Sequence, residues 1–210
     1  MKLWLEACFL FALLFVSSSA LTPECEKLIE PLTLEEQLKA YGRMNILMGF
    51  ADTAGFKGIQ KAYGSYWMDI TASPSGPGHL VVAHHKKING VCTSSTVNMT
   101  VEGNTARIRH PGVSGDYQIL PSCEGCLSLS VNYTIADMQN FLERLNVNIT
   151  VGPGAISSHS LFLMANRTSV TDSDMEHFNK QVECFGFSGE PDFRYDEKTS
   201  FCPDGENIEA

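Results

Sequence analysis

The stretch "AYGRMNILMGFAD" (residues 40–52) decides the fold, because its loose alternation predicts a β-strand with an unusual inner face. Side chains alternate across a strand, so Met44, Ile46, Met48 and Phe50 share one face. Methionine is flexible and polarizable, and it adapts well to an irregular apolar guest. If Met44 faces the interior, this strand lines either a ligand cavity or a filled core.

Seven more β-type runs follow, each bounded by Gly, Pro, Asn or Ser. They are "AYGSYWMDITA" (62–72), "GHLVVAHHKK" (78–87), "GVCTSSTVNMTVE" (90–102), "NTARIRH" (104–110), "DYQILPS" (116–122), "CLSLSVNYT" (126–134) and "SHSLFLMAN" (158–166). Eight short strands at close spacing predict an antiparallel sandwich or barrel.

Two glycosylation sequons indicate which way the strands face, because a glycan must point outward. If Asn98 points outward, alternation places Val97, Met99 and Val101 on the inner face and Cys92 on the outer face. Asn132 outward places an apolar set on the inside of its strand: Leu127, Leu129, Val131 and Tyr133. A β-bulge would shift this parity.

Two helices are predicted. Ser173 can cap the later one, with Glu176 completing a capping box and Gly186 ending the helix. Its apolar stripe is Met175, Phe178 and Val182. The other helix runs roughly over residues 137–145, between the last two strands, where a hairpin needs only a short turn. It is therefore interpreted as an insertion.

The N-terminus and the cysteines indicate export. Residues 1–20 have a basic start, an apolar run too short to span a bilayer, and a small-residue cleavage pattern at Ala20, which predicts a signal peptide. Residues 21–210 are then expected to form a single domain. The six remaining cysteines predict three disulfides. Sequons at Asn98, Asn132, Asn148 and Asn166 predict a glycoprotein.

The formal charge is −9, which argues against nucleic-acid partners and against binding to anionic membranes. No motif for catalysis or for phosphate binding is present. His84 and His85 are adjacent on a strand and point to opposite faces, so a shared metal site is not expected. Arg107 and Arg109 share a face, either as interior polar anchors or toward solvent.

The order of eight strands, one helix and an irregular tail with a cysteine resembles the lipocalin superfamily. The stretches "ECEKLIEPLTLEEQLKAYGRMNILMGFAD" (24–52), "YQILPSCEGC" (117–126), "MEHFNKQVECFGF" (175–187) and "SFCPDG" (200–205) carry the resemblance. Within that superfamily they are similar to the acid glycoprotein (orosomucoid) and apolipoprotein M branch, and to fish plasma glycoproteins that bind tributyltin, saxitoxin or tetrodotoxin. This sequence departs from the family's Gly-x-Trp motif, because Met44 stands where the family has the Trp. In the family a basic side chain near the end of the last strand packs against that Trp, and Arg167 is the matching residue here.

The resemblance implies an all-β, eight-stranded antiparallel up-and-down barrel with a C-terminal α-helix outside it. It implies disulfides Cys25–Cys184 and Cys92–Cys202, which leaves Cys123 and Cys126 for each other around a Glu124-Gly125 turn. A Cys-x-x-Cys pair is also compatible with a redox or metal site.

The function implied is binding, carriage or sequestration of a small hydrophobic or amphipathic ligand, of the toxin, organotin, steroid or lipid class, in plasma or mucus. No cofactor, catalysis or stable membrane insertion is expected. The expected lining is Met44, Ile46, Met48, Phe50, Tyr66, Met68, Val97, Met99, Leu129, Val131 and Tyr133. The direction of Trp67 stays open.

Two alternatives remain. The insertion helix is predicted to act as a lid through Phe141 and Leu142, or else to pack on the barrel exterior. The whole protein is either a ligand carrier or a surface glycoprotein, read by a cell-surface receptor or another partner, whose barrel is empty or filled.

Overall fold

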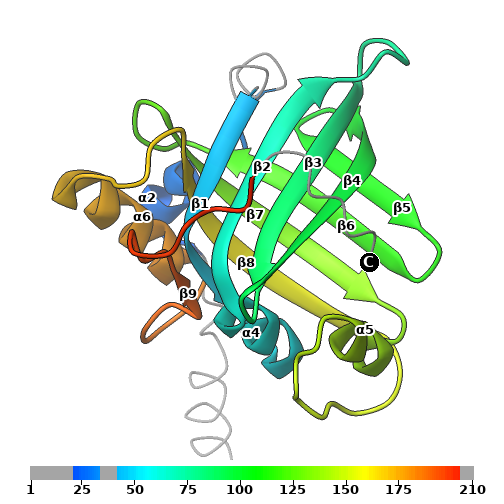
Figure 1. The fold of residues 1–210 in the computed structure, drawn as a ribbon. Coiled ribbons are helices and arrows are strands. Elements are labelled where there is room, and N and C mark those ends of the chain that lie inside the picture. The colour runs from blue at the N-terminus through cyan, green and yellow to red at the C-terminus, as the bar shows by residue number, and fades with distance from the viewer. Residues whose placement is uncertain (1–20, 34–41, 204–210) are drawn as a thin grey trace, which may run out of the picture.

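Eight antiparallel strands close into a barrel in the computed structural model, which describes residues 21–33 and 42–203. The predicted signal peptide (1–20), the first two residues of the stretch that begins at Ala40, and the end of the tail (204–210) lie outside the described residues. Each strand pairs with the next, and the eighth pairs with the first (Figure 1). The prediction of an eight-stranded up-and-down barrel is confirmed.

The strand bounds follow the sequence patterns closely. They are β1 Gly42–Ala51, β2 Tyr63–Ala72, β3 His79–Ile88, β4 Val91–Glu102, β5 Thr105–His110, β6 Val113–Leu120, β7 Cys126–Ile135 and β8 Ile156–Ala165. A two-residue strand, β9 (Phe193–Arg194), adds to β1 at Met48 and Gly49. This last strand was not predicted, because two residues carry no alternation.

A β-bulge in β1 reverses the parity of its second half. Ile46 pairs with Met164 and Met48 pairs with Leu163, so Leu47 is an extra residue in the ladder. Met44 and Ile46 face the interior, but Leu47, Met48 and Phe50 join the cluster between the barrel and the C-terminal helix. The expectation that Met48 and Phe50 face the interior is therefore wrong.

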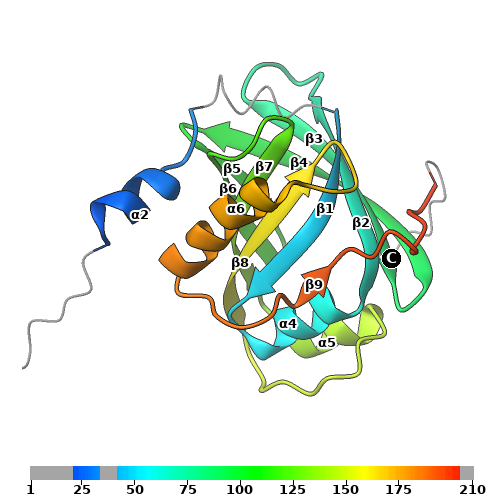
Figure 2. The same ribbon diagram turned by 90° about the vertical axis from the view of Figure 1, so that its left-hand side faces the viewer.

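Helix α6 (Asp172–Cys184) packs on the outer face of β1 and β8, as Figure 2 shows. Phe178 is fully buried there. The helix begins two residues earlier than predicted, because Thr171 rather than Ser173 is the N-cap and Asp174 completes the capping box. Gly186 has a positive φ of 76° and follows the helix end at Phe185, as predicted.

Three disulfides bind the outer segments to the barrel. They are Cys25–Cys184, Cys92–Cys202 and Cys123–Cys126. The first two are the pairs that the lipocalin resemblance implies, and the third is the pair that these two leave over. The first attaches the short helix α2 (Pro23–Leu28) to the end of α6. The second holds the tail outside β4, where the indole Nε1 of Trp67 donates to the Cys202 carbonyl at 3.0 Å. Trp67 therefore faces outward.

Two helices lie at one end of the barrel, below the strands in Figure 1. Helix α4 (Ala54–Lys61) fills the β1–β2 connection, and α5 (Met138–Arg144) fills the β7–β8 connection. Only α5 was predicted. Gly58 allows α4 to approach Ile149 closely, since a Cβ at this position would overlap the Ile149 side chain. No helix in the described part of the chain is long and apolar enough to cross a membrane.

Candidate ligand-binding site

The barrel interior has a packed half and a hollow half. The half far from α4 and α5 is packed, and four methionines contribute to it: Met44, Met68, Met99 and Met164. Ile46, Leu129 and Val131 belong to the same buried cluster. Met44 of β1 therefore belongs to the floor of the barrel and does not line its cavity, and Met48 lies outside the barrel.

The hollow half contains a cavity of about 340 Å³ beneath α4 and α5. Its wall is mostly apolar and aromatic: Phe56, Ile59, Tyr63, Tyr66, Ile88, Val97, Ile108, Val113, Tyr117, Tyr133, Ile135, Phe141, Leu145 and Phe162. The remaining wall residues are polar: Gln60, His84, Lys86, Ser95 and His110. This composition, an apolar surface with a few polar groups, is typical of a small-molecule site.

A hydrogen-bonded pair forms part of the polar wall. The Tyr66 hydroxyl lies 2.7 Å from Nδ1 of His84 across the β2–β3 ladder. Burial lowers the pKa of His84 well below its usual value, helped by the charges of Lys86 and His85, so the imidazole is neutral. Burial raises the pKa of Tyr66 well above its usual value. Both groups are thus uncharged at physiological pH.

Lys86 places an amine in the same wall, two residues from His84 on the same face of β3. Its Nζ lies 5.2 Å from the centre of the Tyr66 ring, within cation–π range. Burial lowers the pKa of Lys86 to about 8. At neutral pH most molecules therefore carry one positive charge inside the cavity.

Gln60 fixes α4 to the barrel. Its amide nitrogen donates to the Phe50 carbonyl at 3.1 Å and to Ser160 Oγ at 3.4 Å. Gly49 makes room for this side chain, because a Cβ there would lie 2.5 Å from Gln60 Oε1. The Oε1 atom is buried and has no hydrogen-bond partner among the described residues. The helix is therefore part of the cavity wall and not a loose connection.

The insertion helix α5 lies across the same end of the barrel. Phe141 and Leu145 line the cavity. Leu142 is fully buried, and it packs with Met138 and Val147 in the apolar cluster between α5 and α4. Phe141 thus lies where a lid residue was expected, and Leu142 lies in the packing that holds α5 in place. The alternative of a helix on the barrel exterior is not what the structure shows.

Of the eleven expected lining residues, three line the cavity: Tyr66, Val97 and Tyr133. Six are interior but lie in the packed cluster: Met44, Ile46, Met68, Met99, Leu129 and Val131. Met48 and Phe50 are outside, as described above. The prediction that the side chain faces inward was thus correct for nine residues. Strand alternation does not tell at which level along the barrel axis a side chain lies, so it could not separate the cavity from the packed floor.

The lining residues that were missed include Tyr63, His84, Lys86, Tyr117 and Phe162. The sequence did indicate that His84 and Lys86 face inward. In the strand "GHLVVAHHKK" they share one face with Leu80 and Val82, and these two are apolar and belong to the core side. His85 is the outward one, stacked 3.8 Å from Trp67.

Arg107 and Arg109 face solvent, and Ile108 between them lines the cavity. Arg109 pairs with Asp116 at 2.6 Å, and Arg107 pairs with Glu102 and Asp116. Of the two options left open for these arginines, the outward one is correct. They cannot serve as interior anchors.

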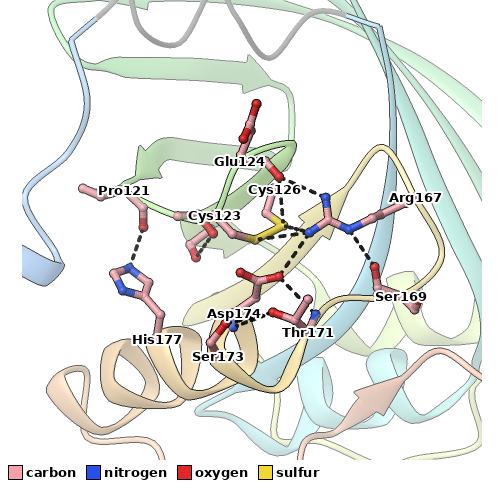
Figure 3. The surroundings of a disulfide bond; sticks show 12 residues. Pro121, Cys123, Glu124, Cys126, Arg167, Ser169, Thr171, Ser173, Asp174 and His177 are labelled. Carbon is pink, nitrogen blue, oxygen red and sulfur yellow. Dashed lines mark hydrogen bonds and ion pairs between the residues drawn. A yellow bond between two sulfur atoms is a disulfide. The ribbon is translucent and has the colours of Figure 1, made fainter.

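The Cys123–Cys126 disulfide closes the turn that begins β7, as Figure 3 shows. The Cys126 amide donates to the Cys123 carbonyl at 2.9 Å, which places Glu124 and Gly125 at the centre of the turn. Arg167 donates to the Glu124 carbonyl at 2.9 Å and pairs with Asp174 of α6 at 3.1 Å (Figure 3). The bond therefore staples the turn within an ordinary polar network.

A metal at this turn is the alternative that the spacing left open. The sulfur atoms of Cys123 and Cys126 and a carboxylate oxygen of Asp174 lie within 4.8 Å of one another. With the sulfurs bonded to each other, neither is a thiolate, and thiolate is the form that binds metals. The geometry supports the structural interpretation of this pair.

The four sequon asparagines, Asn98, Asn132, Asn148 and Asn166, all have exposed side chains. Each can therefore accept a glycan without rearrangement of the barrel. The inward parity derived from Asn98 and Asn132 agrees with the positions of Val97, Met99, Leu129 and Val131.

Solved structures with a similar fold are lipocalins. The siderocalin Ex-FABP, described as functioning through dual ligand specificities, is 12% identical with a TM-score of 0.56 over 76% of this chain and 95% of that chain. The bovine lipocalin allergen Bos d 2 is 17% identical with a TM-score of 0.55, over 80% and 99%. A dog lipocalin allergen is 12% identical with a TM-score of 0.51, over 78% and 97%.

These likenesses, together with the closed barrel, establish the fold. The chain has the lipocalin fold, with the C-terminal helix α6 outside the barrel. No family model matches the sequence, and no curated protein matches it. At these sequence identities the neighbours describe the fold alone.

Proposed function

We propose that the protein is a secreted glycoprotein that binds a small hydrophobic or amphipathic molecule in its barrel and carries or sequesters it. The observation that carries this proposal is the apolar cavity of about 340 Å³ beneath α4 and α5. By the volume of liquid water this is room for roughly ten water molecules, so the buried part of the guest is small. A toxin, a steroid fragment, an organotin compound or a lipid tail falls within the class.

Burial supplies the affinity. A ligand that loses about 300 Å² of apolar area gains at most about 7 kcal/mol at about 25 cal/mol per Å². The cost of ordering the ligand reduces this figure. The wall can donate several hydrogen bonds, from Tyr66, His84 or Lys86, and these set the orientation. The role is binding, and no step of catalysis is proposed.

Export is proposed on the sequence. A signal peptide over residues 1–20, removed to leave one domain over 21–210, would deliver the chain to an oxidising compartment. The three disulfides and four exposed sequon asparagines fit that compartment. Plasma or mucus is the proposed location, and the acid glycoprotein and apolipoprotein M branch the proposed kinship.

The test is native mass spectrometry of the enzymatically deglycosylated protein, purified gently from its own secretion. We expect an added mass that disappears on denaturation, which would also give the size of the ligand. A bare mass that is unchanged after incubation with lipids, steroids and toxins would contradict carriage.

A second candidate function is favoured by the exposure of all four sequon asparagines. They lie on β4, β7, the α5–β8 connection and the residue after β8, so glycans there would surround much of the barrel. Such a surface could be read by a cell-surface receptor without any ligand in the barrel. Enzymatic removal of the glycans separates the two, because it would abolish receptor recognition and leave ligand retention unchanged.

A further inference from the structure

Among the described residues, the Lys86 ammonium has no counter-ion in the cavity wall. No Asp or Glu is among the residues that line the cavity, although the chain as a whole carries a formal charge of −9. Within the described residues no carboxylate lies in ion-pair distance of Lys86 Nζ, which instead faces the Tyr66 ring at 5.2 Å from its centre. A cation in an apolar wall costs free energy unless something pairs with it.

The neighbouring Tyr66–His84 pair keeps one polar hydrogen unused. If the tyrosine hydroxyl donates to Nδ1, the imidazole hydrogen is on Nε2; if Nδ1 donates, the hydroxyl hydrogen is free. No other side chain in the described part of the chain hydrogen-bonds to either group. Among the described residues, the cavity wall therefore places the Lys86 ammonium and a neutral donor of the Tyr66–His84 pair on adjacent strands, with no Asp or Glu beside them.

We propose that the natural ligand is an amphipathic monoanion, with a carboxylate head that pairs with Lys86 and accepts a hydrogen bond from the Tyr66–His84 pair. Its apolar body lies against the aromatic wall formed by Phe56, Tyr117, Tyr133 and Phe141. This inference rests on the proposed binding function and names the class of ligand within it.

The single positive charge of Lys86 favours a head group with one negative charge over one with two. A phosphate monoester carries nearly two charges at neutral pH, and proteins commonly bind it with clustered arginines. Here the two arginines of β5, Arg107 and Arg109, face solvent and are already paired with Glu102 and Asp116. One ammonium and one neutral donor match the charge and the acceptor atoms of one carboxylate.

The test compares three probes of equal length: dodecanoate, dodecanol and dodecylamine. The full secreted glycoprotein is stripped of bound ligand and titrated with each by calorimetry at neutral pH. We expect dodecanoate to bind on the order of ten- to a hundredfold more tightly than dodecanol, with dodecylamine weakest. Equal affinity for the acid and the alcohol would overturn the inference while leaving ligand carriage intact.

Variants locate the effect. K86M is expected to abolish the preference for dodecanoate over dodecanol, and K86R to retain most of it. The matched control is K87M, which removes the same charge from the outer face, where Lys87 Nζ donates to Ser200 Oγ at 3.0 Å. K87M should keep the full preference. A preference that survives in K86M, or that K87M removes equally, would contradict the assignment to Lys86, as would failure of all three probes to bind. Thermal unfolding of each variant checks that the barrel is intact.

Discussion

The hydroxyl of Tyr66 and Nδ1 of His84 lie 2.7 Å apart within the barrel, on neighbouring strands. The pair joins the wall of the cavity to the floor beneath it, since Met68, the register partner of His84, belongs to the packed cluster. A buried neutral pair of this kind stabilises the fold and also presents a donor to the cavity. Its two roles can be separated.

Replacement of Tyr66 by phenylalanine keeps the ring and removes the hydroxyl. Because His84 is then left buried without its partner, we expect Y66F to lower the free energy of unfolding by about 1–3 kcal/mol. Urea unfolding followed by circular dichroism measures this. The double variant Y66F/H84L removes both polar groups and should recover part of the loss. Equal stability of Y66F and the parent would show that the hydrogen bond contributes nothing.

The affinity for dodecanoate is expected to fall as the pH rises through 8. Burial lowers the pKa of Lys86 to about 8, so roughly a tenth of the lysine is protonated at pH 9. Affinity at pH 9 should therefore be up to about tenfold weaker than at pH 7. The other titratable groups of the wall are Tyr63, Tyr66, His84, His110, Tyr117 and Tyr133. Burial keeps the four tyrosines protonated in this range.

In K86M the same titration should be flat between pH 7 and pH 9. An unchanged slope in that variant would place the titrating group elsewhere. The ligand-free protein should behave oppositely to the complex. The pKa of Lys86 is lower in the folded than in the unfolded state, so the unfolded chain binds more protons between about pH 8 and pH 10. Relative to K86M, the ligand-free parent should therefore gain stability as the pH rises through that window.

Substitutions of Phe141 and Leu142, which are adjacent on α5, test ligand release and protein stability separately. Phe141 lines the cavity, whereas Leu142 is fully buried in the packing between α5 and α4. We expect F141A to raise the ligand off-rate several-fold with a small effect on unfolding. L142A should cost about 2–5 kcal/mol of stability. Stopped-flow displacement of a fluorescent ligand measures the off-rate. An off-rate that F141A leaves unchanged would exclude α5 as a lid, and deletion of the helix should give the largest increase.

The disulfides differ in the length of chain that they close. Cys25 and Cys184 are 159 residues apart, so removing their bond is expected to cost up to about 5 kcal/mol in the chain-entropy model. Cys123 and Cys126 are 3 residues apart, and the same model gives about 2 kcal/mol. Paired Cys→Ser variants compared by chemical unfolding test this order. A larger loss from the short loop would mean that the turn itself, with Arg167 and Asp174, controls stability.

Most of the strand pattern was predictable because alternation is a local property of the sequence. The runs at 62–72, 90–102 and 126–134 fall within one residue of β2, β4 and β7. The bulge at Leu47 was not predictable, because Ile, Leu and Met suit both faces and nothing in "NILMGF" marks an extra residue. One inserted residue then reversed the direction of Met48 and Phe50.

Helix α4 was missed for a different reason. Its sequence, "AGFKGIQK", contains two glycines, and glycine disfavours an isolated helix. The helix forms because Phe56 and Ile59 pack against α5 and the end of the barrel, and Gln60 bonds to β1 and β8. Likewise, Thr171 and Ser173 are both good N-caps, and the structure uses Thr171, whose capping box is completed by Asp174.

The central claim is that the hollow end of the barrel holds the ligand, and a filled cavity tests it most directly. Val97 lines the cavity, whereas its neighbour Thr96 is exposed on the outer face of β4. V97W should fill the space, and T96W adds the same bulk outside. In native mass spectrometry of secreted, deglycosylated protein, we predict that T96W retains the bound mass and that V97W loses it. Retention of the same mass by a folded V97W variant would contradict the account.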